Sequence, residues 1–228
     1  MDERNIQVDI SEAYRYLGGR GTPDESIESE LKRAAALIME NIRPRSVTKV
    51  CEIERSGALT LKGTQLRLEG KSISALLHDS ELCVIFCATI GNNVDDLVRT
   101  WLFRDTAFAA MLDACASSAV ESFCDSLQGE LEDESASQGL YITDRFSPGY
   151  GDLPLDVQPE FCSVLDTARK IGVVVGESLL MTPKKSVTAV IGISKNPQKH
   201  FTTGCANCER INSCRFRENG VSCYGRTV

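Results

Sequence analysis

Residues 81–91, ELCVIFCATIG, form a continuous apolar run that ends in glycine. A run of this kind suits a β-strand that is buried on both faces, because a strand with one solvated face alternates apolar and polar residues. The segments 46–54 and 58–70 do alternate, which predicts half-buried antiparallel strands. Another strand is predicted over residues 187–193, where Gly192 leaves room for something to approach closely.

Other regions have the residue spacing of helices. Helices are predicted over residues 22–43, 94–127 with a break near 103–106, and 158–172. The first of them begins with a capping threonine, Thr22. The acidic and small residues of 129–139 predict an exposed loop. Strands, helices and strands again, without a regular βαβ rhythm, predict an α+β fold.

The charge and the cysteine content restrict the class of protein. A formal net charge of -7 argues against general affinity for nucleic acid or anionic membrane. Short basic clusters such as Lys184-Lys185 are predicted to be solvated turns. The first ten residues carry charges of both signs and no apolar core of signal-peptide length, and no apolar run approaches the ~20 residues of a membrane span. We therefore expect a cytoplasmic protein, in which the six scattered cysteines are reduced and buried.

Residues 145–155, RFSPGYGDLPL, have neither a helical nor a strand period and little conformational freedom. Pro148 fixes its own φ, while Gly149 permits conformations closed to other residues. On this backbone stand Arg145, whose planar guanidinium suits a carboxylate or phosphate, and Tyr150, which offers a ring and a hydroxyl group. The residues alone allow a ligand-binding loop, or a structural turn in which Arg145 pairs with a surface acid and Tyr150 packs in the core.

This loop and the sequence after it resemble the activation, or reactivation, domain of cobalamin-dependent methionine synthase. In that family an R-x-x-P-G-Y loop, a short helix, an IG…ES…M-x-P segment and a strand occur in this order. The match runs through Arg145, Pro148, Gly149, Tyr150, Ile171, Gly172, Glu177, Ser178, Met181, Pro183, Ser186 and Val187. A weaker match in ASSAVESFCDSL places Glu121 where the family has a glutamate facing the ligand.

The resemblance implies one domain, residues 1–200, with a twisted, largely antiparallel sheet flanked by helices. The first 80 residues do not resemble the multidomain enzyme, and the chain looks more like free-standing relatives of the domain. The implied ligand is S-adenosylmethionine: Arg145 would grip its carboxylate, Glu121 would meet its ammonium, and backbone groups beside Pro148 and Gly149 would receive the adenine. Tyr150 would stack or hydrogen-bond.

The reaction implied by the resemblance is the reductive methylation of oxidised cobalamin. The chain contains no D-x-H-x-x-G, the family mark of a histidine that ligates cobalt, so the cobalamin has to come with a corrinoid-dependent methionine synthase or another corrinoid protein. An electron donor such as a flavodoxin or ferredoxin is also needed. We expect no turnover by this chain alone, because methyl transfer to cobalt needs both proteins.

The C-terminal segment 201–228 contains four closely spaced cysteines, Cys205, Cys208, Cys214 and Cys223. Four thiolates complete a tetrahedral zinc site or hold a four-iron, four-sulfur cluster, so the segment is predicted to be a metal-binding tail. The spacing does not distinguish the two metals. Reduced structural cysteines or redox-active pairs are the other interpretation of the same residues.

Two further functions fit parts of the sequence. One is an S-adenosylmethionine-dependent methyltransferase acting on another acceptor. The usual methyltransferase fold is disfavoured, because no Gly-rich strand-to-helix loop is followed by an acid-tipped strand. The other is a zinc or iron-sulfur interaction or redox protein in which the loop 145–155 is structural.

Overall fold

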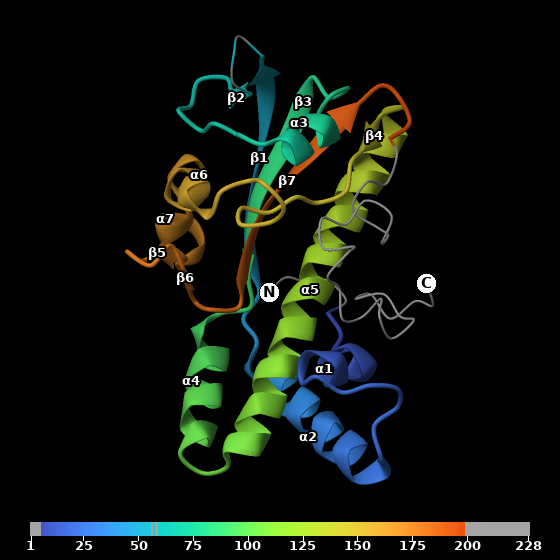
Figure 1. Cartoon of the computed structure of the whole chain (residues 1–228), viewed down its shortest axis with the longest axis vertical. Coiled ribbons are helices and arrows are strands. Elements are labelled where there is room, and N and C mark those ends of the chain that lie inside the picture. The colour runs from blue at the N-terminus through green and yellow to red at the C-terminus, as the bar shows by residue number, and fades with distance from the viewer. Residues whose placement is uncertain (1–5, 56, 58, 199–228) are drawn as a thin grey trace. The chain divides into compact units, whose positions relative to one another are not determined.

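The computed structural model describes residues 6–55, 57 and 59–198. These residues form an α+β fold, as the order of the sequence patterns predicted (Figure 1). The strands are β1 (Arg45–Glu54), β2 (Thr60–Leu61), β3 (Leu82–Thr89), β4 (Tyr141–Ile142), β5 (Val174–Val175), β6 (Met181–Thr182) and β7 (Ser186–Ser194). The helices are α1 (Ile10–Tyr16), α2 (Glu25–Asn41), α3 (Lys71–Leu76), α4 (Asn92–Leu102), α5 (Thr106–Ser137), the 3-10 helix η1 (Leu155–Val157), α6 (Gln158–Leu165) and α7 (Thr167–Ile171).

The main sheet has five strands in the order β2-β1-β3-β7-β4, and β5 and β6 form a separate antiparallel pair. The neighbours in the main sheet run antiparallel. At opposite ends of the β1 and β3 pair, the Arg43 N–H donates to the Ile90 carbonyl at 2.7 Å and the Ile53 N–H donates to the Glu81 carbonyl at 2.9 Å. The apolar run of β3 is buried along nearly its whole length, which confirms a strand covered on both faces.

Several predicted elements are confirmed and others are wrong. The break near 103–106 exists, because α4 ends at Leu102 and α5 begins at Thr106. The exposed loop predicted over 129–139 is wrong, because α5 continues to Ser137. Gly139 follows the helix with a φ of 70°. In the segment 58–70, the described residues 59–70 hold only the two-residue strand β2 and an isolated bridge between Thr60 and Arg67. The cap of α2 is Asp24 rather than Thr22, with its carboxylate accepting from the Ile27 N–H.

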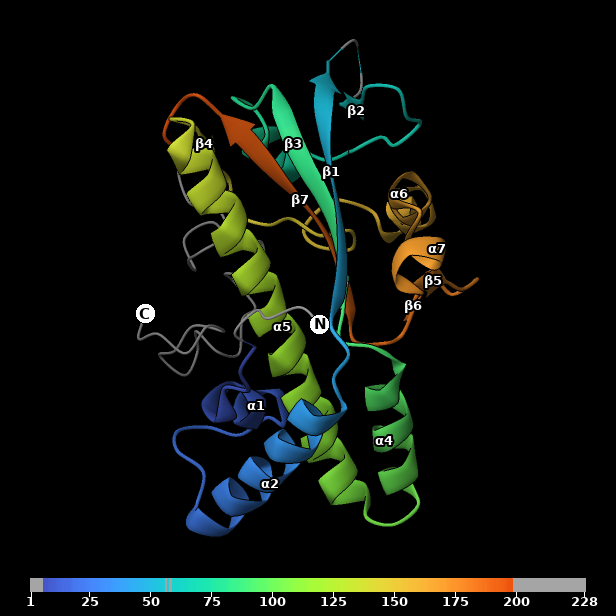
Figure 2. The same cartoon turned by 180° about the vertical axis from the view of Figure 1, so that it is seen from behind.

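The described chain divides into two units. Among the described residues, unit 1 comprises 6–49, 85–131 and 158–188, and unit 2 comprises 50–55, 57, 59–84, 132–157 and 189–198. In unit 1, α1, α2 and α4 lie beside the first half of α5 (Figure 2). Helix α2 contributes its buried residues Leu31, Ala34 and Ile38 to the core of this unit.

Helix α5 is long and apolar enough to cross a membrane by length and composition. It is nevertheless a core helix, because 61% of its most apolar window is buried inside the protein. Its buried residues include Leu112, Ala116, Ala119 and Phe123. The other described helices do not meet the same criterion.

The six cysteines outside the C-terminal segment are free and buried, as predicted. They are Cys51, Cys83, Cys87, Cys115, Cys124 and Cys162. Burial raises the pKa of the Cys115 thiol to about 12. Burial, together with a smaller effect of the neighbouring Cys51, raises the pKa of the Cys83 thiol to about 12. These two thiols are held in the neutral, unreactive form.

Candidate functional site

The loop 145–155 lies in unit 2 and begins where the chain leaves the main sheet. Phe146 forms a two-way backbone bridge with Val190 of β7, its N–H donating at 3.0 Å and its carbonyl accepting at 2.9 Å. The Phe146 side chain is buried at 4% exposure. The backbone next to Arg145 is therefore fixed to a central strand, which limits the entropy that the loop would lose on binding a ligand.

The middle of the loop is closed by its own backbone. The Gly149 N–H donates to the Leu153 carbonyl at 2.9 Å, and the Leu153 N–H donates to the Tyr150 carbonyl at 3.1 Å. Gly149 has a φ of 82°, a left-handed conformation that disfavours other residues. Pro148 and Leu153 are buried beneath this turn. The structure thus confirms the constrained backbone that the sequence predicted.

The two side chains predicted to meet a ligand differ in exposure. Arg145 is half-buried and already makes an interaction within the protein. Tyr150 is 51% exposed, and its ring meets the Phe146 ring edge-to-face with centroids 5.6 Å apart. The structural interpretation of the loop had placed Tyr150 in the core, and its exposure contradicts that part. The loop therefore presents a phenol to the surface on a rigid base.

Asp152, at the end of the same loop, caps a helix from about 80 residues away. Gly70, the N-cap residue of α3, has no side chain for capping, and the Asp152 carboxylate accepts from the Lys71 and Ser72 N–H groups instead. Burial raises the pKa of this carboxyl, but these hydrogen bonds outweigh burial and the net shift of the pKa is downward. The cap ties the loop to α3 within unit 2.

Replacing Asp152 with asparagine should lower the free energy of unfolding by about 0.5–1 kcal/mol, the low end for a capping residue because the side chain is exposed. A lowered pKa stabilises the fold above the unfolded-state pKa of about 3.9 and loses that stabilisation as the pH falls through the folded-state pKa. Urea unfolding at pH 7 and pH 3 should therefore show the two proteins converging in acid. A constant difference at both pH values would exclude the charged cap.

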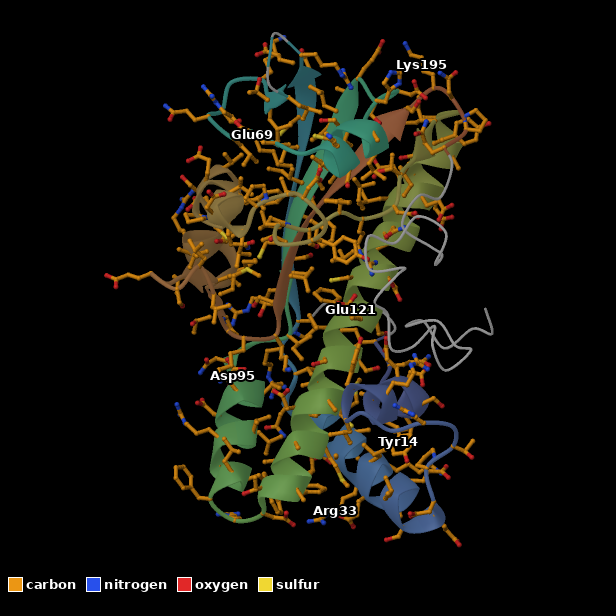
Figure 3. All side chains as sticks on the ribbon, in the orientation of Figure 1. Tyr14, Arg33, Glu69, Asp95, Glu121 and Lys195 are labelled. Atoms are coloured by element: carbon orange, nitrogen blue, oxygen red, sulfur yellow. The ribbon has the colours of Figure 1, made fainter. Side chains whose placement is uncertain are left out.

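Glu121 lies on α5 in unit 1 (Figure 3). It lines a cavity of about 570 Å³. The cavity is lined by α1, α5 and the segment entering β7. Its walls are formed by Tyr16, Leu17, Ala110, Asp113, Ala114, Ser117, Val120, Glu121, Lys184, Lys185 and Ser186. Glu121 is half-buried and has an interaction within the protein. The weaker of the predicted ligand contacts thus faces a hollow large enough for a small molecule.

Of the two lysines that line the same cavity as Glu121, one is exposed as predicted and the other is not. The Lys184 side chain is exposed, but that of Lys185 is 13% exposed. Its ammonium contacts the Asp113 carboxylate at 2.9 Å and the Ser117 hydroxyl at 2.8 Å. The prediction of a solvated turn was therefore wrong for Lys185. Sequence reasoning missed this pair because Asp113 and Lys185 are far apart in the chain, and no local pattern joins them.

No group of three or more histidine, cysteine, aspartate or glutamate side chains within residues 6–198 is arranged to hold a metal ion. The predicted metal ligands Cys205, Cys208, Cys214 and Cys223 lie outside the described residues. Their role stays a prediction from the sequence.

Comparison with known proteins identifies the family. The family model for the activation domain of vitamin B12 dependent methionine synthase matches residues 77–219. No curated protein matches the chain. A solved structure of the MetH reactivation domain bound to AdoHcy is similar, with a TM-score of 0.62 and 16% sequence identity, covering 95% of this chain and 82% of that chain. The structural likeness shows a shared fold, and the family model covers more than half of the chain. This chain therefore belongs to the family of vitamin B12 dependent methionine synthase activation domains.

Proposed function

We propose that this chain binds S-adenosylmethionine and supports the reductive methylation of a corrinoid cofactor held by a corrinoid-dependent methionine synthase. The observation that carries the proposal is the match of residues 77–219, which include the constrained loop, to an activation-domain family. The similar solved structure, a reactivation domain bound to AdoHcy, adds support. AdoHcy differs from S-adenosylmethionine by the methyl group on sulfur.

The loop offers groups that suit this ligand. A half-buried guanidinium on a fixed backbone would match the planar carboxylate of the amino-acid end, and we assign this role to Arg145. The Gly149 and Tyr150 N–H groups are already used within the turn, so the backbone there would offer carbonyl oxygens, which suit the amino group of adenine. The half-exposed Tyr150 ring can stack on the ligand.

Glu121 is proposed to meet the ligand's ammonium group. It is half-buried, and a partly desolvated carboxylate attracts a cation more strongly than an exposed one does. Lys185 also lines this cavity, and its ammonium is paired with the Asp113 carboxylate of α5 at 2.9 Å. Lys185 therefore adds little net positive charge near Glu121.

In this proposal the chain contributes positioning rather than bond-breaking chemistry. The corrinoid, held by the partner protein, would supply the redox chemistry and the acceptor for the sulfonium methyl group, with S-adenosylhomocysteine as the other product. The residues of the chain would hold the sulfonium in place and keep it from moving away from its acceptor. A loop fixed by its own backbone hydrogen bonds is suited to this task, because it would lose little conformational entropy on binding a ligand.

The reaction also needs two partner proteins. A corrinoid protein has to supply the cofactor, and a reduced electron carrier such as a flavodoxin or ferredoxin has to supply the electron. Zinc or a four-iron, four-sulfur cluster is proposed at the four C-terminal cysteines, where a cluster would offer a route for that electron. The free state of the six described cysteines is in keeping with the cytoplasm, where thiols stay reduced.

Calorimetric titration of the full chain with S-adenosylmethionine is expected to show saturable binding at one site. With a cognate corrinoid methionine synthase and a reductant supplied, the chain should accelerate methylation of the oxidised cobalamin, followed by the cobalamin absorbance spectrum. Binding without that acceleration would favour a methyltransferase of another acceptor. An absence of binding would remove the proposed function and leave the interaction or redox protein.

A further inference from the structure

Helix α3 is a fixed element of unit 2 beside the loop 145–155. Its side chains Ile73 and Leu76 are buried in the core. At its C-terminal end the Arg55 guanidinium donates to the Leu77 carbonyl at 2.7 Å. This bond satisfies a carbonyl group that the end of a helix leaves without an intrahelical partner. The helix is therefore held both by its apolar face and at its C-terminal end.

Asp152 of the loop holds the other end of this helix. Its carboxylate accepts hydrogen bonds from the Lys71 N–H and from the Ser72 N–H, the latter at 3.1 Å. Gly70 leaves room for this contact, because a Cβ at position 70 would lie 2.9 Å from the carboxyl carbon and 3.0 Å from the main-chain oxygen of Asp152. A negative charge at a helix N-terminus is also favourable. Asp152 thus joins the loop to a fixed helix through two backbone donors.

The backbone next to Asp152 packs closely as well. Gly151 has a φ of 54°, and a Cβ there would lie 3.2 Å from Cζ of Phe146 and 3.6 Å from the Ser72 hydroxyl oxygen. Gly151 therefore lies against the Phe146 ring, and the same ring meets the Tyr150 ring edge-to-face. The capping residue and the exposed phenol belong to one packed group of neighbours.

The loop has another attachment at its beginning, where Phe146 bridges to Val190 of β7. Arg145 adjoins this attachment in the chain, whereas Tyr150 lies between it and Asp152. Loss of the Asp152 contact would therefore free the Tyr150 side of the loop more than the Arg145 side.

We propose that Asp152 is a positioning residue of the S-adenosylmethionine site, which holds Tyr150 and the turn 149–153 in the conformation that receives the ligand. Both carboxylate oxygens of Asp152 accept from backbone N–H groups of α3, so it acts through the turn and not by touching the ligand. Without the cap the turn would adopt further conformations, and only the fraction in the binding conformation would take up ligand. This role rests on the proposed function and deepens it, because it names a residue that sets the affinity of the same site.

Calorimetric titration of the full chain with S-adenosylmethionine tests this role. Asp152→Ala removes both accepting oxygens and should raise the Kd about tenfold, which corresponds to ~1.4 kcal/mol and to the ordering of about one residue of backbone. Asp152→Asn keeps one accepting oxygen and should raise the Kd only about threefold.

Asp24→Ala is the matched control. Asp24 caps α2 in unit 1, where its carboxylate accepts from the Ile27 N–H at 2.9 Å. Its replacement should also lower the free energy of unfolding through the loss of a cap, and it should leave the Kd unchanged. The comparison separates an effect on the loop from a general loss of stability.

A double-mutant cycle tests whether Asp152 acts through Tyr150. Tyr150→Ala removes the ring that Asp152 is proposed to position. In that background Asp152→Ala should weaken binding by about threefold or less, against about tenfold in the wild-type chain.

Amide hydrogen exchange reports on the loop without any ligand. The Gly149 and Leu153 N–H groups donate within the turn, and Asp152→Ala should make them exchange at least about tenfold faster. The Val190 N–H of β7, which donates to the Phe146 carbonyl at 2.9 Å, should exchange as in wild type.

Several results would overturn the role of Asp152. They are an unchanged Kd in a folded Asp152→Ala variant, an equal weakening by Asp24→Ala, fully additive losses in the double variant, and exchange that quickens uniformly across the loop and β7. If the wild-type chain binds no S-adenosylmethionine, the proposed function fails, and exchange still decides whether Asp152 holds the turn. Acceleration confined to Gly149 and Leu153 would support that hold, and unchanged exchange would exclude it.

Discussion

Replacing Gly192 with alanine is expected to lower the free energy of unfolding by about 3 kcal/mol, the upper part of the range for overpacking a core. A Cβ at this position of β7 would lie 2.8 Å from Cδ2 of Leu77 and 3.0 Å from Cγ2 of Thr143, and closer still to the Ser80 hydroxyl. Leu77 is fully buried and Ser80 is 1% exposed, so neither side chain has space to retreat. The Gly192 N–H also donates to the Thr143 hydroxyl at 2.8 Å, and displacing Thr143 would strain that bond.

Gly129→Ala is the matched control. Gly129 lies in α5, and a Cβ there meets nothing within 4 Å. Neither glycine is among those with a positive φ, so the backbone tolerates alanine at both positions. Alanine at 129 should raise the free energy of unfolding by about 0.5–1 kcal/mol through its helix propensity. Urea unfolding with an unchanged m-value checks both variants, and a loss at Gly192 no larger than about 0.5 kcal/mol would mean that the packing relaxes.

The close approach at Gly192 was predictable, but its partner was not. A glycine inside an otherwise apolar strand indicates that something comes near. What comes near is the end of α3, a six-residue helix that lacks the length to show a helical period and was not predicted. Its N-terminus is capped by Asp152 from a distant part of the chain, so no local capping signal preceded it either.

Helix α5 shows the opposite error. Its last turns consist mainly of acidic and small residues, and this composition led to the prediction of an exposed loop. Glutamate and alanine are nevertheless good helix formers, and an existing helix extends through them at little cost. The helix ends only near Gly139, whose left-handed φ of 70° marks the stop.

One part of the candidate site could be predicted from the sequence and another could not. The prolines and glycines of loop 145–155 predict a constrained backbone, and the local hydrogen bonds of the structure confirm it. The cavity beside Glu121 was not predictable, because it depends on α1, α5 and the segment before β7 coming together. Local chemistry is readable from one stretch of sequence, whereas long-range pairs such as Lys185 with Asp113 need the fold.

Replacing Arg145 with alanine is expected to weaken the binding of S-adenosylmethionine by about 2 kcal/mol or more, which is about 30-fold in Kd. The reason is that the ligand's carboxylate would lose a bidentate, charge-assisted hydrogen bond. The loop 145–155 contains no other lysine or arginine that could replace Arg145. Isothermal titration calorimetry of wild type and variant at one salt concentration measures the change. Because Arg145 is half-buried and has a partner inside the protein, the thermal stability of the variant has to be measured alongside.

Two further variants separate the geometry of the guanidinium from its charge. Arg145→Lys keeps the positive charge but loses the planar fork, so it should recover only part of the affinity, leaving a loss of about 1 kcal/mol. Arg169→Ala removes an arginine whose side chain is 81% exposed and paired with Asp166, and it should bind like wild type. If Arg145→Ala binds as tightly as Arg169→Ala while remaining folded, the carboxylate is held by another group and the role assigned to Arg145 is wrong. If lysine restores full affinity, charge alone accounts for the contact, and the rigid loop is not needed to orient a planar fork.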